Sequence, residues 1–334
     1  MLDGKSVLVT GGTGSFGQKI VETVLDDYHP KRLIIFSRDE LKQHDMSRRF
    51  DPRVHRCLRY FIGDVRDRER LYRAFDGVDF VVHAAALKQV PSCEYNPLEA
   101  VKTNVLGAAN VIDAAIDRNV SKVVALSTDK ASNPINLYGA TKLCSDKLFI
   151  SANNYSGGHH TRFAVVRYGN VLGSRGSVIP LFLKMRSQGV LPVTDARMTR
   201  FWITLAQGAD FVLKSLQRMH GGELFVPKIP TMSLLDLARA IGPECRIETV
   251  GIRPGEKLHE TMISEDDARH TLEYDDHYVI LPELQAAGFS RGADSEGGKP
   301  CPEGFRYGSD TNTLRLSVED LRRMIELPEM RKVA

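Results

Sequence analysis

Tyr138 and Lys142 are the two side chains whose types and spacing most directly suggest catalysis. Because they are four residues apart, a helix would place both on the same face. A tyrosine hydroxyl has an ordinary pKa of about 10 and is a poor base at neutral pH, but a nearby ammonium favours the phenolate and lowers that pKa. The pair therefore predicts that Tyr138 removes a proton from a substrate hydroxyl while hydride leaves the same carbon. The same spacing also arises by chance on helix surfaces, so its meaning depends on the surrounding elements.

A glycine-rich turn near the N-terminus supplies that context. Residues 7–17 read as a buried strand that ends in Gly11, Gly14 and Gly17, and an amphipathic segment follows at residues 18–26. A strand, a tight turn and a helix N-terminus can hold a pyrophosphate, since backbone N–H groups and the helix dipole face the anion. Glycine triplets also occur in ordinary turns, but directly after the first strand this one predicts a dinucleotide site. The residues expected to contact the dinucleotide here are Gly11, Thr13, Gly14, Ser15, Phe16 and Gly17.

The residues after the second expected strand bear on the identity of the dinucleotide. An NAD site usually has an acidic residue at this point, which accepts a hydrogen bond from the ribose 2′-hydroxyl. This chain instead has the small and neutral Ser37, followed by Arg38 and Lys42, and these two cations can bind a 2′-phosphate. Asp39 and Glu40 can point away or act as N-terminal charges on the next helix. A solvated polar turn is the alternative, but the basic pair favours NADP over NAD.

Two further strand ends are expected to complete the cofactor site. Asp64 follows the third strand and could accept a hydrogen bond from the adenine amine, with Val65 beside it. After the fourth strand, the small side chains between Ala84 and Ala86 would let the backbone lie against the cofactor. His83, at the end of that strand, is expected to be a packed residue rather than a catalyst.

The overall composition is typical of a soluble enzyme and argues against several other classes. The chain has 334 residues, of which 42% are hydrophobic, so it can bury a large core in one large domain or two smaller ones. A net charge of +3 is too small to indicate a nucleic-acid or membrane-surface partner. Neither a membrane-spanning apolar run nor a secretory signal is visible. Five scattered cysteines without a metal-binding pattern predict reduced thiols, a cytoplasmic location and no metal site.

Short apolar runs alternate with stretches of helical length in the first half of the chain. The runs lie at residues 6–9, 33–36, 58–62, 80–83, 122–126 and 162–167. This rhythm predicts an α/β fold, a Rossmann-type doubly wound parallel sheet with helices on both faces. We expect an NADP-binding domain at residues 1–170 and a smaller C-terminal substrate-binding lobe at residues 171–334, with some elements returning to the sheet.

Three features of the second half complete the predicted fold. A long helix near residues 205–219 is expected to pack back on the sheet. Residues 288–308 are rich in Gly, Ser, Pro and charge, which predicts an exposed loop. Ser317 and Asp320 resemble a capping box that opens a last helix, and that helix should end near Pro328.

Taken together, these residues resemble the extended short-chain dehydrogenase/reductase superfamily over nearly the whole chain. Three further stretches, SRDELKQ at 37–43, TDKASNP at 128–134 and GIRPGEKLHE at 251–260, are similar to the inverting UDP-N-acetylglucosamine 4,6-dehydratases of pseudaminic acid synthesis. The resemblance implies a cytoplasmic enzyme with tightly held NADP that acts on a UDP-sugar. We also expect a homo-oligomer.

The reaction implied by this resemblance is a hydro-lyase reaction with an internal redox cycle. UDP-N-acetylglucosamine would be oxidised at C4, lose water across C5 and C6 with inversion at C5, and regain hydride at C6. The product would be UDP-2-acetamido-2,6-dideoxy-β-L-arabino-hex-4-ulose.

The pair Asp129 and Lys130, directly after Thr128 at the end of the fifth strand, is expected to carry the elimination. By the same resemblance, retaining sugar-nucleotide 4,6-dehydratases have Asp-Glu after the threonine, so Lys130 replaces their glutamate. Lys130 could remove the C5 proton if burial and neighbouring cations lower its pKa. Asp129 would protonate the departing hydroxyl, while Tyr138 and Lys142 would act at C4, and Lys142 would also hold the nicotinamide ribose. A surface lysine that caps a loop is the alternative for Lys130.

Five residues are candidates for binding the substrate. Asn170 could donate to a diphosphate oxygen, and Lys88 could approach the sugar or a phosphate. Arg200 and Arg253 are candidates for the nucleotide diphosphate, and Glu256 could accept from the uridine ribose hydroxyls. Taken alone, a residue of each of these types is solvated or salt-bridged as often as it binds a substrate. The resemblance favours all of them except Arg200.

Three other functions remain open on the sequence alone. A retaining UDP-sugar 4,6-dehydratase would use a glutamate in place of Lys130, and a UDP-hexose 4-epimerase needs no base at C5. An NADP-binding regulator could share the same fold, because a fold does not determine a function. The intact Thr128, Tyr138 and Lys142 argue against such a regulator.

Overall fold

The structure is a computed structural model that describes residues 1–174, 176–283 and 297–326. Its centre is a 10-stranded sheet. The strands of this sheet are β1 (Ser6–Thr10), β2 (Arg32–Ser37), β3 (Leu58–Ile62), β4 (Phe80–His83), β5 (Lys122–Thr128), β6 (Arg162–Tyr168), β10 (Leu224–Pro227), β14 (Thr271–Glu273), β15 (His277–Ile280) and β16 (Lys299–Pro300). All six predicted strands are confirmed, and four of them extend one or two residues beyond the apolar run.

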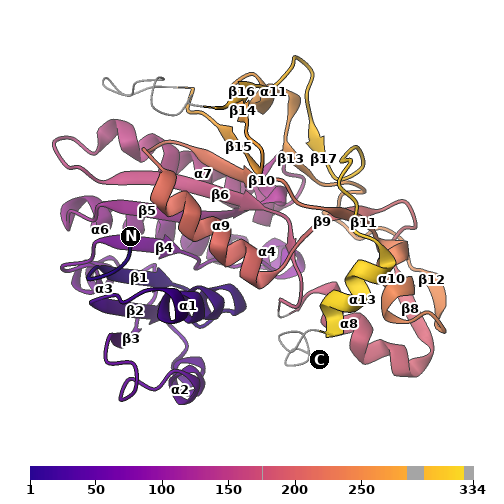
Figure 1. Cartoon of the computed structure of the whole chain (residues 1–334), viewed down its shortest axis with the longest axis horizontal. Coiled ribbons are helices and arrows are strands. Elements are labelled where there is room, and N and C mark those ends of the chain that lie inside the picture. Colours follow the sequence, from indigo (N-terminus) through magenta and orange to yellow (C-terminus); the bar gives the residue numbers. More distant parts are fainter. Residues whose placement is uncertain (175, 284–296, 327–334) are drawn as a thin grey trace.

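The strand order is β16-β14-β15-β10-β6-β5-β4-β1-β2-β3 (Figure 1). Neighbours from β3 to β10 are parallel, whereas β15, β14 and β16 add in antiparallel fashion at the other edge. The order 3-2-1-4-5-6 is that of the doubly wound dinucleotide-binding fold, and the predicted Rossmann-type α/β fold is confirmed. The order reverses between β1 and β4, so a ligand site is expected at the carboxyl ends of these two strands.

Helices cover both faces of the sheet (Figure 1). On one face lie α1 (Ser15–Asp27) and α9 (Leu205–Arg218), which contact each other. On the other face lie α3 (Arg68–Ala74), α6 (Gly107–Asp117) and α7 (Leu137–Tyr155). Next to β3 is α2 (Glu40–Arg49), which connects it to β2. The arrangement confirms that the helix near residue 205 packs back on the sheet.

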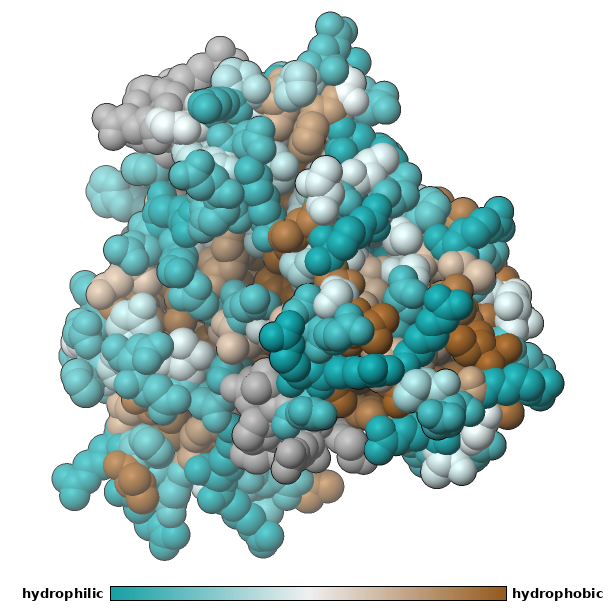
Figure 2. Space-filling view, turned by 45° about the vertical axis from the view of Figure 1, so that its right-hand side comes forward, coloured by the Kyte–Doolittle hydropathy of each residue, from teal (hydrophilic) through white to brown (hydrophobic). Residues whose placement is uncertain are grey.

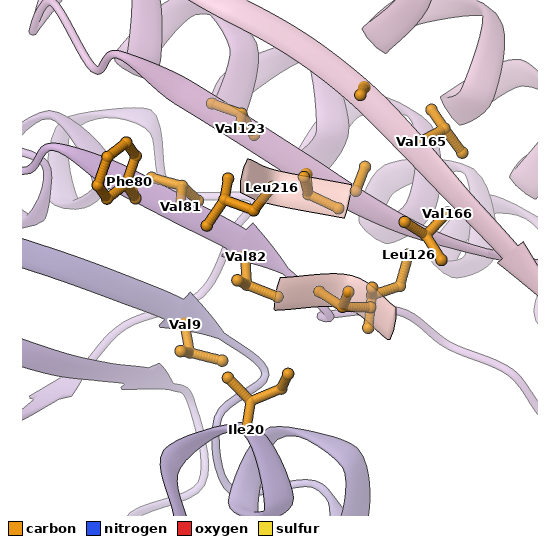
Figure 3. Packing of buried hydrophobic residues seen from close by; sticks show 14 of the residues in the cluster. Val9, Ile20, Phe80, Val81, Val82, Val123, Leu126, Val165, Val166 and Leu216 are labelled. Carbon is orange, nitrogen blue, oxygen red and sulfur yellow. The ribbon is translucent and has the colours of Figure 1, made fainter. Parts of the chain in front are cut away.

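One hydrophobic core joins the two halves of the chain (Figure 3). Val9 from β1 and Val82 from β4 are fully buried, and so is Leu216 from α9. Burial of one such side chain contributes about 1.5–3 kcal/mol of stability. Because α9 packs on this core, residues beyond 170 belong to the domain around the sheet as well as to the smaller lobe.

The smaller lobe has its own hydrophobic cluster, which includes the buried Trp202, Leu237 and Leu321. Its helices are α8 (Val178–Met185), α10 (Leu234–Ile241) and α13 (Val318–Glu326). Its strands are β7 (Asn170–Val171), β8 (Val190–Val193), β9 (Thr199–Ile203), β11 (Thr231–Ser233) and β12 (Arg246–Thr249). The remaining elements are α4 (Val90–Tyr95), α5 (Pro97–Val101), a π-helical turn at Lys102–Leu106, β13 (Thr261–Ile263), α11 (Glu265–Ala268) and β17 (Tyr307–Gly308).

The predicted exposed loop at residues 288–308 needs correction where the structure describes it. Residues 284–296 lie outside the described part, but residues 297–308 contain β16 and β17. Tyr307 is buried because its hydroxyl hydrogen-bonds the backbone of Ile229 and its ring packs on Phe201. The predicted start of the last helix is confirmed, since Ser317 Oγ accepts from the Asp320 N–H at 3.0 Å. Pro328 lies outside the described residues.

The face of the molecule drawn in Figure 2 is mostly hydrophilic, and its hydrophobic residues lie in separate patches. In the described part of the chain, no helix has the length and apolar character needed to cross a membrane. All five cysteines are free thiols, as predicted.

Candidate active site

A cavity of about 600 Å³ lies at the carboxyl ends of the parallel strands, where the sheet order reverses. The predicted cofactor and catalytic residues that line it are Gly11, Thr13, Gly14, Ser15, Phe16, Gly17, Ser37, Arg38, Lys42, Asp64, Val65, Ala84, Ala86, Thr128, Asp129, Lys130, Tyr138 and Lys142. The topology therefore brings residues from the carboxyl ends of five strands and from α7 to one place.

The glycine turn forms a tight cradle at the start of α1. A Cβ on Gly11, which has φ +63°, would lie 2.8 Å from the Ala85 nitrogen, and one on Gly17 would lie 2.6 Å from the Gly11 carbonyl oxygen. Larger residues therefore do not fit without a backbone shift. No side chain caps the first turn of α1 and no acidic residue lies in it. Its N–H groups and dipole suit an anion such as a pyrophosphate.

The predicted 2′-phosphate residues lie together at one end of the cavity. Ser37 Oγ is 2.7 Å from Thr13 Oγ1. Arg38 and Lys42 are about half exposed, and each faces a carboxylate, at 3.6 Å from Asp64 and 2.8 Å from Asp39. Asp39 also caps α2, as one of the two sequence-based alternatives proposed. The two cations are thus placed to exchange these partners for a phosphate.

The catalytic loop follows β5 directly. Thr128 Oγ1 donates to Asp129 Oδ1 at 2.9 Å, and Lys130 Nζ lies 3.1 Å from the same oxygen. Lys130 Nζ also lies 3.2 Å from Glu260 Oε1. Asp129 and Glu260 are both fully buried, whereas the Lys130 side chain is 24% exposed and lines the cavity. Lys130 thus lies between two buried carboxylates, which argues against the alternative of a surface lysine that caps a loop.

The electrostatics of Lys130 differ from the prediction. Burial alone would lower its pKa, but the carboxylates of Asp129 and Glu260 outweigh burial and hold the pKa above its ordinary value. The expectation that neighbouring cations lower this pKa is therefore wrong for the protein alone, because the nearest groups are anions. Burial raises the pKa of Asp129, which suits a group that gives up a proton during a reaction.

Tyr138 and Lys142 lie on the first turns of α7. The helix begins after Asn136, whose side chain accepts from the Gly139 N–H at 2.7 Å. Burial raises the pKa of Tyr138 to about 12, against the opposing effects of the Lys130 charge and a hydrogen bond with Thr128. Burial also lowers the pKa of Lys142. The expected lowering of the Tyr138 pKa is thus not seen in the protein alone, and the main cation that opposes its rise is Lys130.

His83 is a packed strand-end residue, as expected. It is 1% exposed, and its Nδ1 lies 2.8 Å from Thr10 Oγ1. Burial lowers the pKa of His83 to about 3, so the ring is neutral in the folded protein. Its imidazole does not line the cavity.

The predicted substrate residues divide into three groups. Lys88 and Asn170 line the cavity. Arg253 and Glu256 lie outside its lining, with 3.6 Å between Arg253 Nε and Glu256 Oε1. Arg200 is buried, and its guanidinium donates to backbone carbonyls, including that of Lys257 at 2.8 Å. The expectation that Arg200 binds a diphosphate does not fit this placement, because its donors are already used inside the protein.

Sequence reasoning missed Glu260 as a member of the site. The segment 251–260 packs on the catalytic loop: Lys257 Nζ donates to the Ser132 carbonyl at 2.6 Å, and Asn136 Nδ2 donates to the Gly255 carbonyl at 2.8 Å. Glu260 ends the stretch GIRPGEKLHE, and that stretch was the available signal. Further lining residues that were not predicted include Thr103, Tyr168, Ser174, Ser177 and Leu205.

Comparisons with known proteins identify relatives of this chain. A family model described as "Polysaccharide biosynthesis protein" matches residues 7–282. The chain is 54% identical over 335 residues to the UDP-N-acetylglucosamine 4,6-dehydratase (inverting) of Campylobacter jejuni subsp. jejuni serotype O:23/36 (strain 81-176). That match covers 98% of this chain and 99% of the relative.

Two solved structures share the fold. The X-ray structure of Pen from Bacillus thuringiensis has a TM-score of 0.89 and 38% identity, with 100% of both chains covered. The crystal structure of DesIV (dTDP-glucose 4,6-dehydratase) from Streptomyces venezuelae, with NAD and TYD bound, has a TM-score of 0.68 and 25% identity. It covers 76% of this chain and 86% of that chain.

Proposed function

The chain belongs to the polysaccharide biosynthesis protein family, and from this premise we propose that it catalyses the inverting 4,6-dehydration of UDP-N-acetylglucosamine. The single observation that supports this best is the placement of Lys130 beside Asp129 in the same cavity as Tyr138. A dehydratase needs an acid and a base at C5 and C6 in addition to the groups that act at C4, and this cavity contains both sets.

We infer that NADP is the cofactor. The glycine cradle would hold the pyrophosphate, and Ser37, Arg38 and Lys42 would hold the 2′-phosphate. Asp64 and Val65 would border the adenine. When bound, the nicotinamide would supply a hydride acceptor for C4 and a hydride donor for C6.

The residues of α7 are proposed to act at the C4 hydroxyl. Tyr138 removes the hydroxyl proton as C4 is oxidised, and Thr128 hydrogen-bonds the tyrosine oxygen and keeps it in place. Lys142 is buried and lines the cavity, so its ammonium can hold a ribose hydroxyl and favour the phenolate. The C4 ketone then acidifies the C5 proton.

Asp129 and Lys130 are proposed to carry the elimination. Transfer of one proton from Lys130 Nζ to Asp129, along their 3.1 Å contact, gives an amine and a carboxylic acid. The amine takes the C5 proton, the electrons of that C–H bond form the C5–C6 double bond, and the C6–O bond breaks as Asp129 protonates the departing hydroxyl to give water. After hydride returns to C6, a proton from solvent reaches C5 from the opposite face and inverts it, and Tyr138 releases the proton of the C4 hydroxyl to solvent.

Substrate binding, location and assembly complete the proposal. Lys88 and Asn170 would contact the sugar and diphosphate from the cavity wall. Arg253 would contact the diphosphate and Glu256 the uridine ribose, since the Arg253 side chain is 61% exposed and Glu256 Oε2 has no hydrogen-bond partner in the described structure. We further propose a cytoplasmic homo-oligomer whose product is used in pseudaminic acid synthesis.

Mass spectrometry of the sugar nucleotide after incubation with UDP-N-acetylglucosamine tests this function. Loss of one water, with inverted C5 configuration by NMR, is expected. An unchanged mass with a new epimer would indicate a 4-epimerase, and retained C5 configuration would indicate a retaining dehydratase. An unaltered substrate would favour a non-catalytic NADP-binding protein.

A further inference from the structure

Lys130 Nζ has two carboxylate neighbours at nearly equal distances, and the mechanism above uses only one of them. Asp129 Oδ1 lies at 3.1 Å and Glu260 Oε1 at 3.2 Å. The Glu260 side chain is 2% exposed and is not part of the cavity lining. Glu260 therefore contacts the candidate base without reaching the substrate space.

Glu260 is held in place and kept charged by its surroundings. Its N–H donates to Ser309 Oγ at 2.9 Å, and its carbonyl accepts from the Ser309 N–H at 2.8 Å. Arg200 Nε lies 3.9 Å and Lys257 Nζ 4.0 Å from its carboxylate. Burial alone would raise the pKa of Glu260, but the charges of Lys130, Arg200 and Lys257 outweigh burial and hold it below its ordinary value. Glu260 is thus a fixed negative charge behind the catalytic loop.

We propose that Glu260 is a positioning residue for the C5 proton transfer, which fixes Lys130 Nζ and stabilises the ammonium formed there. An amine nitrogen has two N–H groups and one lone pair. With its N–H groups directed to Asp129 and Glu260, the lone pair of Lys130 is left for the cavity. This inference rests on the proposed dehydratase function.

The charge of Glu260 acts where charge develops. As Lys130 takes the C5 proton, its amine becomes an ammonium 3.2 Å from a carboxylate that is already ionised and immobile. A preorganised charge of this kind stabilises a transition state without reorganisation. Glu260 itself neither gains nor loses a proton: the C5 proton stays on Lys130, and the proton of Asp129 leaves with the water.

Replacement of Glu260 by glutamine tests this role, because Glu260→Gln keeps the size and one acceptor oxygen but removes the charge. We expect kcat to fall about 10²-fold, as for a catalytic group that is displaced by about 1 Å from its ideal position. The rise of kcat with pH should move to lower pH by about 1–3 units, since the loss of a neighbouring carboxylate favours the neutral amine. KM should not change, because Glu260 does not line the cavity.

Solvent deuterium gives a second readout. Its entry into C5 of the product should slow in parallel with kcat in Glu260→Gln. The matched control is Glu273→Gln, which removes a carboxylate 2.7 Å from Lys228 Nζ at a site outside the cavity lining. This control should keep the wild-type kcat and pH profile.

The outcomes separate this inference from the function on which it rests. If the wild type releases no water from UDP-N-acetylglucosamine, both the proposed function and the proposed role of Glu260 are wrong. If the wild type is active and Glu260→Gln keeps the wild-type kcat and pH profile, only the role of Glu260 is overturned. A lower kcat with an unshifted pH profile would also overturn it, because a purely structural role predicts that result.

A second variant and a measurement on the wild type cover the case in which Glu260→Gln does not fold. Glu260→Asp keeps the charge but moves it away from Lys130 by the length of one methylene. We therefore expect kcat to fall, with a smaller shift of the pH profile than in Glu260→Gln. An unchanged kcat would contradict the proposal. In the isotope-labelled wild type, the Lys130 Nζ signal should be that of an ammonium at neutral pH. An amine signal would contradict the proposal, because an ionised Glu260 carboxylate beside Lys130 Nζ favours the ammonium.

Discussion

Gly139 lies so close to the backbone carbonyl of Lys130 that a Cβ at position 139 would overlap with that oxygen. Gly139 directly follows Tyr138 on α7, and the Lys130 carbonyl belongs to the catalytic loop after β5. The helix and the loop therefore meet through backbone atoms. This contact sets the position of Tyr138 relative to Lys130 without any bond between their side chains.

Replacing Gly139 by alanine should push the catalytic loop away from α7. We expect kcat to fall about 10²-fold and the free energy of unfolding to fall by about 1–3 kcal/mol, as for other overpacked sites. Steady-state kinetics and urea unfolding measure the two effects. Gly158→Ala is the control, because a Cβ there meets no atom within 4 Å. Equal activity in the two variants would show that the contact does not position the site.

Tyr138→Phe should remove turnover while the cofactor stays bound. Loss of one general base typically lowers the rate by about 10²–10⁴-fold. Product formation and the nucleotide content of the purified variant are the measurements. Tyr155→Phe, at the exposed end of the same helix, should behave as the wild type. Near-normal turnover of Tyr138→Phe would remove Tyr138 from the mechanism.

Lys130→Ala should bind UDP-N-acetylglucosamine and oxidise C4 but fail to eliminate water. Oxidation depends on Tyr138, so the absorbance of reduced nicotinamide should build up, and no solvent deuterium should enter C5. Lys147→Ala is the control, since its side chain is 64% exposed on the same helix as Tyr138 and lies outside the cavity lining. Elimination at the wild-type rate in Lys130→Ala would move the base role elsewhere, first to Asp129.

Ser37→Asp should change the cofactor preference from NADP towards NAD. The new carboxylate would repel a 2′-phosphate but accept from a 2′-hydroxyl. NADP affinity should fall about 10-fold or more, because like charges placed together in a binding site cost several kcal/mol. The nucleotide released by denaturation identifies the cofactor. Ser121→Asp, an exposed site at the opposite end of the sheet, should retain NADP. NAD alone in the wild-type extract would refute the NADP assignment.

The buried neutral His83 should make the protein sensitive to acid. The unfolded residue titrates near pH 6.5, while burial lowers the folded pKa to about 3. Between these values the unfolded chain binds a proton that the folded chain does not, so the free energy of unfolding falls as the pH falls through this window. The full effect is on the order of 5 kcal/mol for a shift of this size.

The variant His83→Asn tests this linkage, because it keeps an acceptor for Thr10 Oγ1 but cannot titrate. Urea unfolding between pH 7 and pH 4 should show a flatter pH dependence for the variant than for the wild type, within the window described above. His44→Asn, on the exposed surface of α2, should keep the wild-type slope. Identical slopes for His83→Asn and the wild type would assign the acid sensitivity to other groups.

The local pattern of apolar runs and glycines was sufficient to predict the sheet and the glycine turn at the start of α1. Each predicted strand was a run of apolar residues, and most of the predicted cofactor residues lay at or soon after the end of such a run. Parallel strands place their carboxyl ends on one edge, so the site could be assembled before any coordinates were known. The 297–308 segment was predicted wrongly because its composition is loop-like, whereas Tyr307 is buried by a contact with the distant Phe201.

Residue types and short spacings were enough to predict the fold, the residues that line the cavity and the family resemblance. How those residues are charged and paired depends on the tertiary structure. Glu260 and Lys130 are far apart in the chain, and no periodicity connects them, yet Asp129 and Glu260 together hold the pKa of Lys130 above its ordinary value. Arg200 was assigned to the substrate from its charge, but folding turns it inward to the backbone carbonyls and to Glu260. Protonation states depend on distances of a few ångströms between buried groups, and folding alone sets those distances.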